Sequence, residues 1–143
     1  MTEKTSNWFE VSVSCKQMQE DGTTKKVTEV VVVDAMTFAE AEKRAMKELS
    51  SKVKGVEIKN INPAAYKSVF FDDKDGEKWF KAKLSFITLD EATGKEKRSN
   101  TTYLVQADTF NGALANIEET MDGSNDYVTA NICETKIVDV YCR

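Results

Sequence analysis

The chain has 143 residues, 41% of them hydrophobic and 31% charged, with a formal net charge of −4 and no histidine. These values are typical of a soluble globular protein, and no apolar run approaches the roughly 20 residues that a membrane-spanning helix needs. The polar start MTEKTSNW shows no signal pattern, so we expect a cytoplasmic protein without a membrane partner.

The residues that are missing disfavour most catalytic and cofactor sites. Without histidine the chain lacks the commonest general base and metal ligand. Its cysteines, Cys15, Cys133 and Cys142, include no close pair that would indicate a disulfide framework or a zinc site. Glycine-rich phosphate motifs are absent, and DDKDGE lacks the carboxylates of a calcium loop at Phe71 and Ala82. We therefore expect no catalytic residue, no cofactor and no metal, and the protein is predicted not to be an enzyme.

The first predicted elements are two strands and a helix. Residues 9–15 alternate apolar and polar side chains, and a polar turn around Gly22 leads to VTEVVVVDA, whose β-branched centre predicts a strand buried on both faces. The helix TFAEAEKRAMKEL follows, with Thr37 and Glu40 forming a capping box. VEIKNI and YKSVFF then predict a final strand, which Pro63 interrupts with a bend or bulge.

The second half of the chain repeats this order. The Asp-Gly step in DDKDGEK predicts a hairpin that joins the halves edge to edge. After it come the strands WFKAKLSFITL and TTYLVQA, then the helix TFNGALANIEETM, in which Gly112 replaces the capping-box glutamate. YVTANI and KIVDVYC make the last strand.

Matching residues indicate a tandem duplication. Trp8-Phe9 aligns with Trp79-Phe80, and Thr37-Phe38 aligns with Thr109-Phe110 at the two helix starts. We predict one compact domain over 1–143, made of two structural repeats. These repeats cover 7–71 and 78–142. At least one aromatic of each Trp-Phe pair is expected to pack under a helix.

The predicted fold class is α+β. Two strand-strand-helix-strand units are expected to form an antiparallel sheet, with both helices on one face and an approximate two-fold between the halves. Two strand orders stay open. Within each unit the first strand could lie between the second and the third, or the third strands could swap between the halves.

Charged residues supply two candidate binding surfaces. Residues 84–143 hold five Lys and Arg against ten Asp and Glu, which suits a basic protein partner. The candidate partner-binding residues are Glu118, Glu119, Asp122, Asp126, Glu134 and Asp139. Basic residues fall at matching places in the two predicted hairpins, where they could contact a nucleic-acid backbone. These candidate nucleic-acid contacts are Lys25, Lys26, Lys95, Lys97 and Arg98.

The pieces NWFEVSV, KKVTEVVVVDAMTFAEAE, FFDDKDGEKWFKAKLSFITLDEATGKEKRSNTTYLVQA and ICETKIVDVY resemble the uncharacterised proteins of domain-of-unknown-function family 4494. The resemblance covers nearly the whole chain, from Asn7 to Tyr141. It implies a small cytosolic protein of Bacteroides and relatives, or of their phages and mobile elements. The family has no assigned activity or site residues, so none is carried over. VTEVVVVDA departs from the family pattern in lacking a central Pro-Tyr.

Together these observations favour a non-enzymatic phage or mobile-element accessory protein that binds a protein partner, as an inhibitor or adaptor of a host or phage protein. One alternative is a nucleic-acid-binding protein that uses its basic hairpin tips. Another is a protein that sequesters a nucleotide-like signal in a basic cleft between the halves. A homodimer is also open, because an antiparallel sheet leaves free edges.

Overall fold

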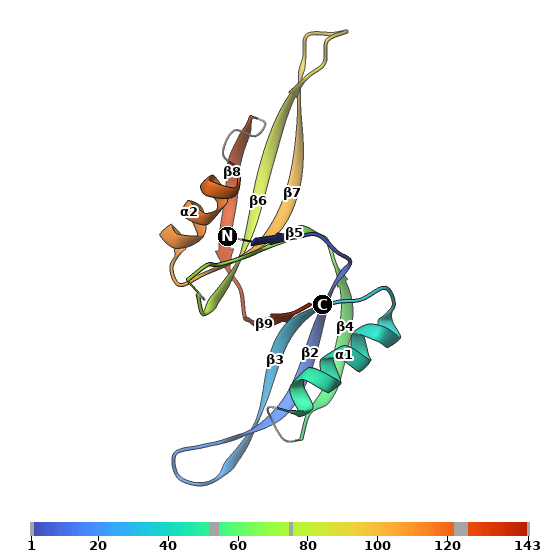
Figure 1. Ribbon diagram of the computed structural model, residues 1–143, viewed down its shortest axis with the longest axis vertical. Helices are drawn as coiled ribbons and strands as arrows, with labels where there is room; N and C mark the ends of the chain where they lie inside the picture. Colours follow the sequence, from blue (N-terminus) through green and yellow to red (C-terminus); the bar gives the residue numbers. More distant parts are fainter. Residues whose placement is uncertain (1, 52–54, 75, 122–125, 143) are drawn as a thin grey trace. The chain divides into compact units, whose positions relative to one another are not determined.

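In the computed structural model, which describes residues 2–51, 55–74, 76–121 and 126–142, two helices and two sheets make an α+β fold (Figure 1). The predicted fold class is thereby confirmed. The described helices fall short of membrane-spanning length and hydropathy. The elements in chain order are β1 (Thr2–Lys4), β2 (Trp8–Met18), β3 (Thr24–Asp34), α1 (Phe38–Ser50), β4 (Glu57–Ala64), β5 (Tyr66–Phe71), β6 (Lys78–Leu89), β7 (Glu96–Ala107), α2 (Phe110–Thr120), β8 (Tyr127–Glu134) and β9 (Ile137–Tyr141).

The chain divides into two compact units, which we name after their helices. The α1 unit comprises Ser6–Ala65 and Lys136–Arg143, and the α2 unit comprises Met1–Thr5 and Tyr66–Thr135. Each unit contains one of the two sheets. This differs from the expected single antiparallel sheet bearing both helices, because two short strands pair in parallel with strands distant in the sequence, as described below.

The sheet of the α1 unit has the order β4-β2-β3-β9. β2 pairs antiparallel with β3 and β4, whereas β9 pairs parallel with β3. Ala41, Ala45 and Leu49 of α1 form a hydrophobic cluster with Phe9 and Val11 of β2. The alternation predicted for β2 explains this contact, since every second side chain of a strand points to the same face.

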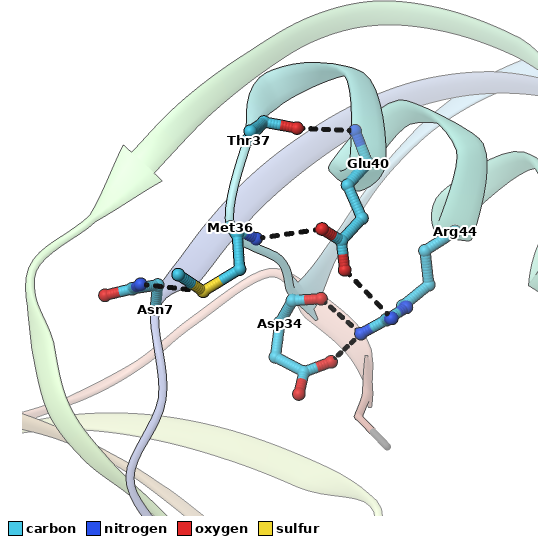
Figure 2. Close-up of polar contacts among 6 residues, drawn as sticks. All are labelled: Asn7, Asp34, Met36, Thr37, Glu40 and Arg44. Atoms are coloured by element: carbon cyan, nitrogen blue, oxygen red, sulfur yellow. Dashed lines mark hydrogen bonds and ion pairs between the residues drawn. The ribbon is translucent and has the colours of Figure 1, made fainter.

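The start of α1 is fixed by the residues predicted to cap it (Figure 2). Thr37 accepts a hydrogen bond from Glu40 N at 3.1 Å, and the Glu40 carboxylate accepts one from Met36 N at 3.3 Å. One turn later Arg44 donates to the backbone oxygen and to the carboxylate of Asp34, and its other terminal nitrogen donates to Glu40. These contacts tie the first two turns of the helix to the end of β3.

The sheet of the α2 unit has the order β1-β5-β7-β6-β8. β6 pairs antiparallel with β7 and β8, whereas β5 pairs parallel with β7. Ala113 and Ile117 of α2 pack in a cluster with Phe80 of β6. Thr109 caps this helix by accepting from Gly112 N at 3.0 Å, so the cap forms without the capping-box glutamate.

The connection between β5 and β6 is not the predicted hairpin, because these strands flank β7 and do not pair with each other. The link is held where it passes the end of β7. Gln106 Nε2 donates to Gly76 O at 2.7 Å, Gly76 N donates to Asp72 Oδ2 at 3.0 Å, and Asn116 of α2 donates to Asp72 Oδ1 at 3.3 Å. Gly76 therefore lies where the link crosses a strand end, and the Asp72 carboxylate stabilises the backbone there. Asp75, the first residue of the Asp-Gly step, lies outside the described residues.

Two short strands lie in a different unit from the strand before them. β4 pairs with β2 in the α1 unit, whereas β5, which follows after Ala65, belongs to the α2 unit. Likewise β8 pairs with β6 in the α2 unit, whereas β9 pairs with β3 in the α1 unit. Each predicted final strand is thus two strands, and the second of each pair is exchanged. For this reason the units do not coincide with the predicted repeats 7–71 and 78–142.

The two Trp-Phe pairs place their residues on opposite faces of their sheets. Phe9 and Phe80 belong to the hydrophobic clusters under α1 and α2, which confirms that one aromatic of each pair packs under a helix. Trp8 and Trp79 are each 2% exposed, and as strand neighbours of Phe9 and Phe80 they point the other way. In the α2 unit Trp79 packs edge-on against Phe71, with ring centroids 5.6 Å apart.

Candidate functional site

Four of the acidic residues predicted to bind a partner belong to the α2 unit, where they are exposed. Two lie near the end of α2 and two border β8: Glu118, Glu119, Asp126 and Glu134. Of the other two, Asp139 lies in β9 of the α1 unit, and Asp122 lies outside the described residues. Of the six predicted acidic residues, the structure therefore places four in or next to α2 and β8.

The α2 unit carries the acidic excess of the chain. It holds nine Lys and Arg against fourteen Asp and Glu, whereas the α1 unit holds eleven against ten. The helix α2 itself contains no Lys or Arg. Within the described part of the chain neither Glu118 nor Glu119 forms an ion pair. Both side chains are exposed to solvent.

A groove runs between α2 and β8. Its volume is about 410 Å³, and it is lined by Phe110 and Leu114 of α2 and by Thr129–Ile132 of β8. Phe110 is 52% exposed, although it lies on the same side of the helix as the buried Ala113 and Ile117. Ile132 lines the groove and also packs against the core under α2. We name this feature the α2–β8 groove.

Phe110 also borders a second cavity, of about 370 Å³, at the start of the helix. The residues that line this cavity include three with charged side chains, Lys78, Asp108 and Glu134. Lys78 Nζ lies 3.1 Å from Glu134 Oε1, and both side chains are more than half exposed. Such an ion pair contributes little to stability, so both groups remain available to a partner.

The basic residues predicted to contact nucleic acid lie on two β-ribbons that extend past the rest of their sheets (Figure 1). β2 and β3 stay paired as far as Met18, whereas β4 stops pairing at Ser14. β6 and β7 stay paired as far as Leu89, whereas β8 stops at Phe86. The predicted contact residues are all exposed: Lys25 and Lys26 in the α1 unit and Lys95, Lys97 and Arg98 in the α2 unit.

The ribbon of the α1 unit has an ordered turn. Gly22 adopts φ 85°, and the Asp21 carboxylate accepts from the backbone N of Thr23 at 3.0 Å and from its hydroxyl at 2.6 Å. These two hydrogen bonds lower the pKa of Asp21. Lys26 lies 3.8 Å from Glu57, with both side chains more than 60% exposed, so the pair constrains the lysine weakly.

Two ionisable groups with raised pKa values lie inside the sheets and away from these surfaces. Burial first, and then the charge of Glu3, raises the pKa of Tyr103. Burial first, and then the charge of Glu29, raises the pKa of the Cys15 thiol. Both shifts favour the neutral form, and they follow from burial in a sheet rather than from a catalytic arrangement.

The groove is the part of this surface that sequence reasoning missed. Phe110 and Leu114 share the helical spacing of the buried Ala113 and Ile117, and this spacing alone does not show which apolar residue stays exposed. A signal was present in β8. Its run from Tyr127 to Cys133 contains no charged residue and no proline, which is unusual for a strand at the edge of a sheet.

The comparisons with known proteins identify a family and no activity. Neither the curated proteins nor the solved structures gave a match. One family model, described as a domain of unknown function, matches residues 7–143. Because this match covers nearly the whole chain, the protein belongs to the DUF4494 family.

Proposed function

We propose that this protein is a non-enzymatic accessory protein that binds a basic segment of a protein partner through the α2 unit, as an inhibitor or adaptor. The observation that carries the proposal is an apolar groove in a unit whose helix also bears two exposed carboxylates, which form no ion pair with any described residue. Glu118 follows Leu114 by one helical turn, so the two side chains share one stripe of α2. A negative surface speeds association with basic partners and rejects acidic ones.

A phage or mobile-element origin and a cytoplasmic location, both implied by the family resemblance, are part of this proposal. The tandem duplication of the two halves is also part of this proposal. It is supported by the strand orders β4-β2-β3-β9 and β8-β6-β7-β5, which correspond position by position. After a duplication one copy can diverge into a binding surface while the other keeps a neutral charge balance.

A fluorescence anisotropy titration tests the proposal with a labelled peptide of alternating lysine and valine, against a glutamate-valine peptide of equal length. We expect the lysine peptide to bind at low salt and the glutamate peptide not to bind. Glu118→Gln/Glu119→Gln should weaken binding about fivefold or more, because exposed charge pairs contribute up to about 1 kcal/mol each. Glu20→Gln/Glu42→Gln changes the net charge equally in the α1 unit and should bind like the wild type.

Two outcomes of this titration would contradict the proposal. One is the absence of lysine-peptide binding even at low salt. The other is equal binding of the two peptides, since the acidic surface would then have no part in recognition.

Binding of single-stranded nucleic acid is the second candidate, and the ribbon of the α1 unit favours it. Lys16 and Lys26 lie directly opposite each other on β2 and β3. Such facing like charges are destabilising, and an anionic backbone would offset that cost. In the same titration, labelled oligonucleotides should then bind with steep salt dependence. Affinity unchanged in a variant with Lys25, Lys26, Lys97 and Arg98 replaced by glutamine would rule this candidate out.

A further inference from the structure

The outer edge of β8 is open to a further strand. Among the described residues β8 pairs with β6 and with no other strand. Thr135 N donates to Trp79 O at 2.9 Å. Hydrogen-bonding direction alternates along an antiparallel strand, so the backbone N–H and C=O groups of Glu134 and Ile132 point away from β6. They form a template to which an extended chain can bind.

The corresponding edge strand of the α1 unit is protected. β4 carries Glu57 and Lys59, whose side-chain charges lie 3.4 Å apart, and it carries Pro63, which has no N–H to donate. Charged residues and proline are the devices that prevent an edge strand from adding a partner. β8 has neither between Tyr127 and Cys133. The two edges therefore differ in the property that decides strand addition.

The α2–β8 groove lies directly beside this open edge. Along an added strand every second side chain would point toward the α2 face. There it meets Phe110 and Leu114 on the helix and Ile132 on the strand, around a volume of about 410 Å³. A space of this size and apolar character suits an aliphatic or aromatic side chain.

Charge decides between a partner protein and a second copy of this chain. Glu118, one helical turn after the groove residue Leu114, and its neighbour Glu119 are both exposed and form no ion pair with a described residue. Pairing β8 with β8 of a second copy would bring two such acidic units together, and like charges across an interface are unfavourable. A segment with lysine or arginine between apolar residues complements both the acidic α2 unit and the groove.

We propose that β8 binds an extended, basic segment of a partner protein as an additional strand, with an aliphatic or aromatic side chain in the α2–β8 groove. Main-chain hydrogen bonds to Ile132 and Glu134 supply affinity, and the groove and the exposed carboxylates of α2 supply selectivity. The inference rests on the proposed function and adds to it the mode of binding.

Amide hydrogen exchange measured by NMR, with and without the lysine-valine peptide, tests the edge directly. We expect exchange at Ile132 and Glu134 to slow about tenfold or more on binding. Ile61 of β4 pairs with Val11 of β2 in the same way as Ile132 of β8 pairs with Ala82 of β6. It serves as the internal reference and should not change.

Three outcomes of this measurement would overturn the proposal, and they differ in what they leave standing. Binding without added protection at Ile132 and Glu134 would refute strand addition while the proposed function stands. Absence of any binding would remove both. Protection that rises with protein concentration in the absence of peptide would assign the edge to a second copy.

A proline variant tests the same point by affinity. Glu134 pairs with Phe80 as Pro63 pairs with Phe9, so Glu134→Pro gives β8 the proline that β4 carries at the matching position. We expect a loss of peptide affinity of about tenfold. Glu134→Gln, which removes the charge and keeps the N–H, should lose much less. Wild-type affinity in a folded Glu134→Pro variant would overturn the proposal.

The groove can be tested even if the proline variant fails to fold. Leu114→Ala should weaken peptide binding about fivefold, because part of the apolar wall is lost. Glu42→Ala changes the matching position of α1 and should leave binding unchanged. Equal affinity of both variants and the wild type would show that the groove takes no part in binding.

Discussion

Gly76 and Ala107 approach each other so closely that a Cβ on Gly76 would lie 2.6 Å from the carbonyl carbon of Ala107 and 2.7 Å from its Cα. Both neighbouring atoms belong to the backbone, which cannot rotate out of the way as a side chain can. Gly76 is also buried. Close passage of the link over the end of β7, rather than a left-handed conformation, therefore requires glycine here.

Gly76→Ala is expected to lower the free energy of unfolding by about 2 kcal/mol, because the added methyl group forces a backbone shift. Gly22→Ala is the matched control. It has no atom within 4 Å of the added Cβ but has φ +85°, so it should cost about 1 kcal/mol through backbone strain alone. Urea unfolding of both variants gives the comparison. A cost for Gly76→Ala no larger than that for Gly22→Ala would show that the link shifts freely.

Ser14 and Ser85 occupy corresponding buried positions on β2 and β6 but differ in hydrogen bonding. Ser85 Oγ lies 2.7 Å from Asn100 Oδ1, whereas Ser14 Oγ has no partner among the described residues. Ser85→Ala should cost about 1 kcal/mol, and Ser14→Ala should be neutral or stabilising, because it removes an unsatisfied polar group. Chemical denaturation of the two variants checks the difference. Equal costs would show that Ser14 is hydrogen-bonded in solution.

Arg44 links α1 to the end of β3 through both the backbone oxygen and the carboxylate of Asp34. Arg44→Ala should destabilise the protein by about 2 kcal/mol, since it leaves the partly buried Asp34 without its cation. Arg44→Lys should recover about half of this, because lysine lacks the planar fork. Thermal unfolding would measure both. A lysine variant as stable as the wild type would show that charge alone suffices.

Alkaline pH is expected to destabilise the protein through Cys15. Burial and the charge of Glu29 raise the pKa of this thiol above its usual value of 9.0. Well below that value the thiol is neutral in both the folded and the unfolded chain, and its stabilising effect is complete. As pH rises the unfolded chain ionises first, so stability is lost until the folded-state pKa is passed. Tyr103, whose pKa is raised from 10.0 by burial and Glu3, continues the loss at higher pH.

Cys15→Val separates these contributions, because valine does not ionise. The slope of unfolding free energy against pH, measured by urea titration from neutral to alkaline pH, should be shallower in this variant where cysteine titrates. Identical slopes for variant and wild type would contradict the assignment to Cys15.

The sequence predicted the elements whose signals are local. Thr37 and Thr109 cap the helices where expected, since a cap depends on residues within one turn. Phe9 and Phe80 pack under the helices because strand alternation fixes which face each side chain takes. The break between β4 and β5 falls at Ala65, beyond the expected interruption at Pro63, which β4 accommodates at the edge of its sheet.

Strand pairing between distant segments was not predictable in the same way. β5 and β9 are short and mostly apolar, and such segments fit beside any strand that offers a free edge. Which edge they take depends on the whole chain. The same holds for the candidate site. The carboxylates of Glu118 and Glu119 could be identified from the sequence alone. The groove became visible once β8 was known to lie at an edge beside α2.

The pairing of β1 with β5 and of β9 with β3 bears on what proteolysis can do to this chain. A protease nick at Ala65, between β4 and β5, would leave two polypeptides. The first keeps β1, which pairs with β5 of the second, and the second keeps β9, which pairs with β3 of the first. Each piece therefore contributes one strand to the sheet formed mainly by the other, and backbone hydrogen bonds would hold the two pieces together. We expect such a nicked protein to migrate as one species on a native gel and to separate when denatured.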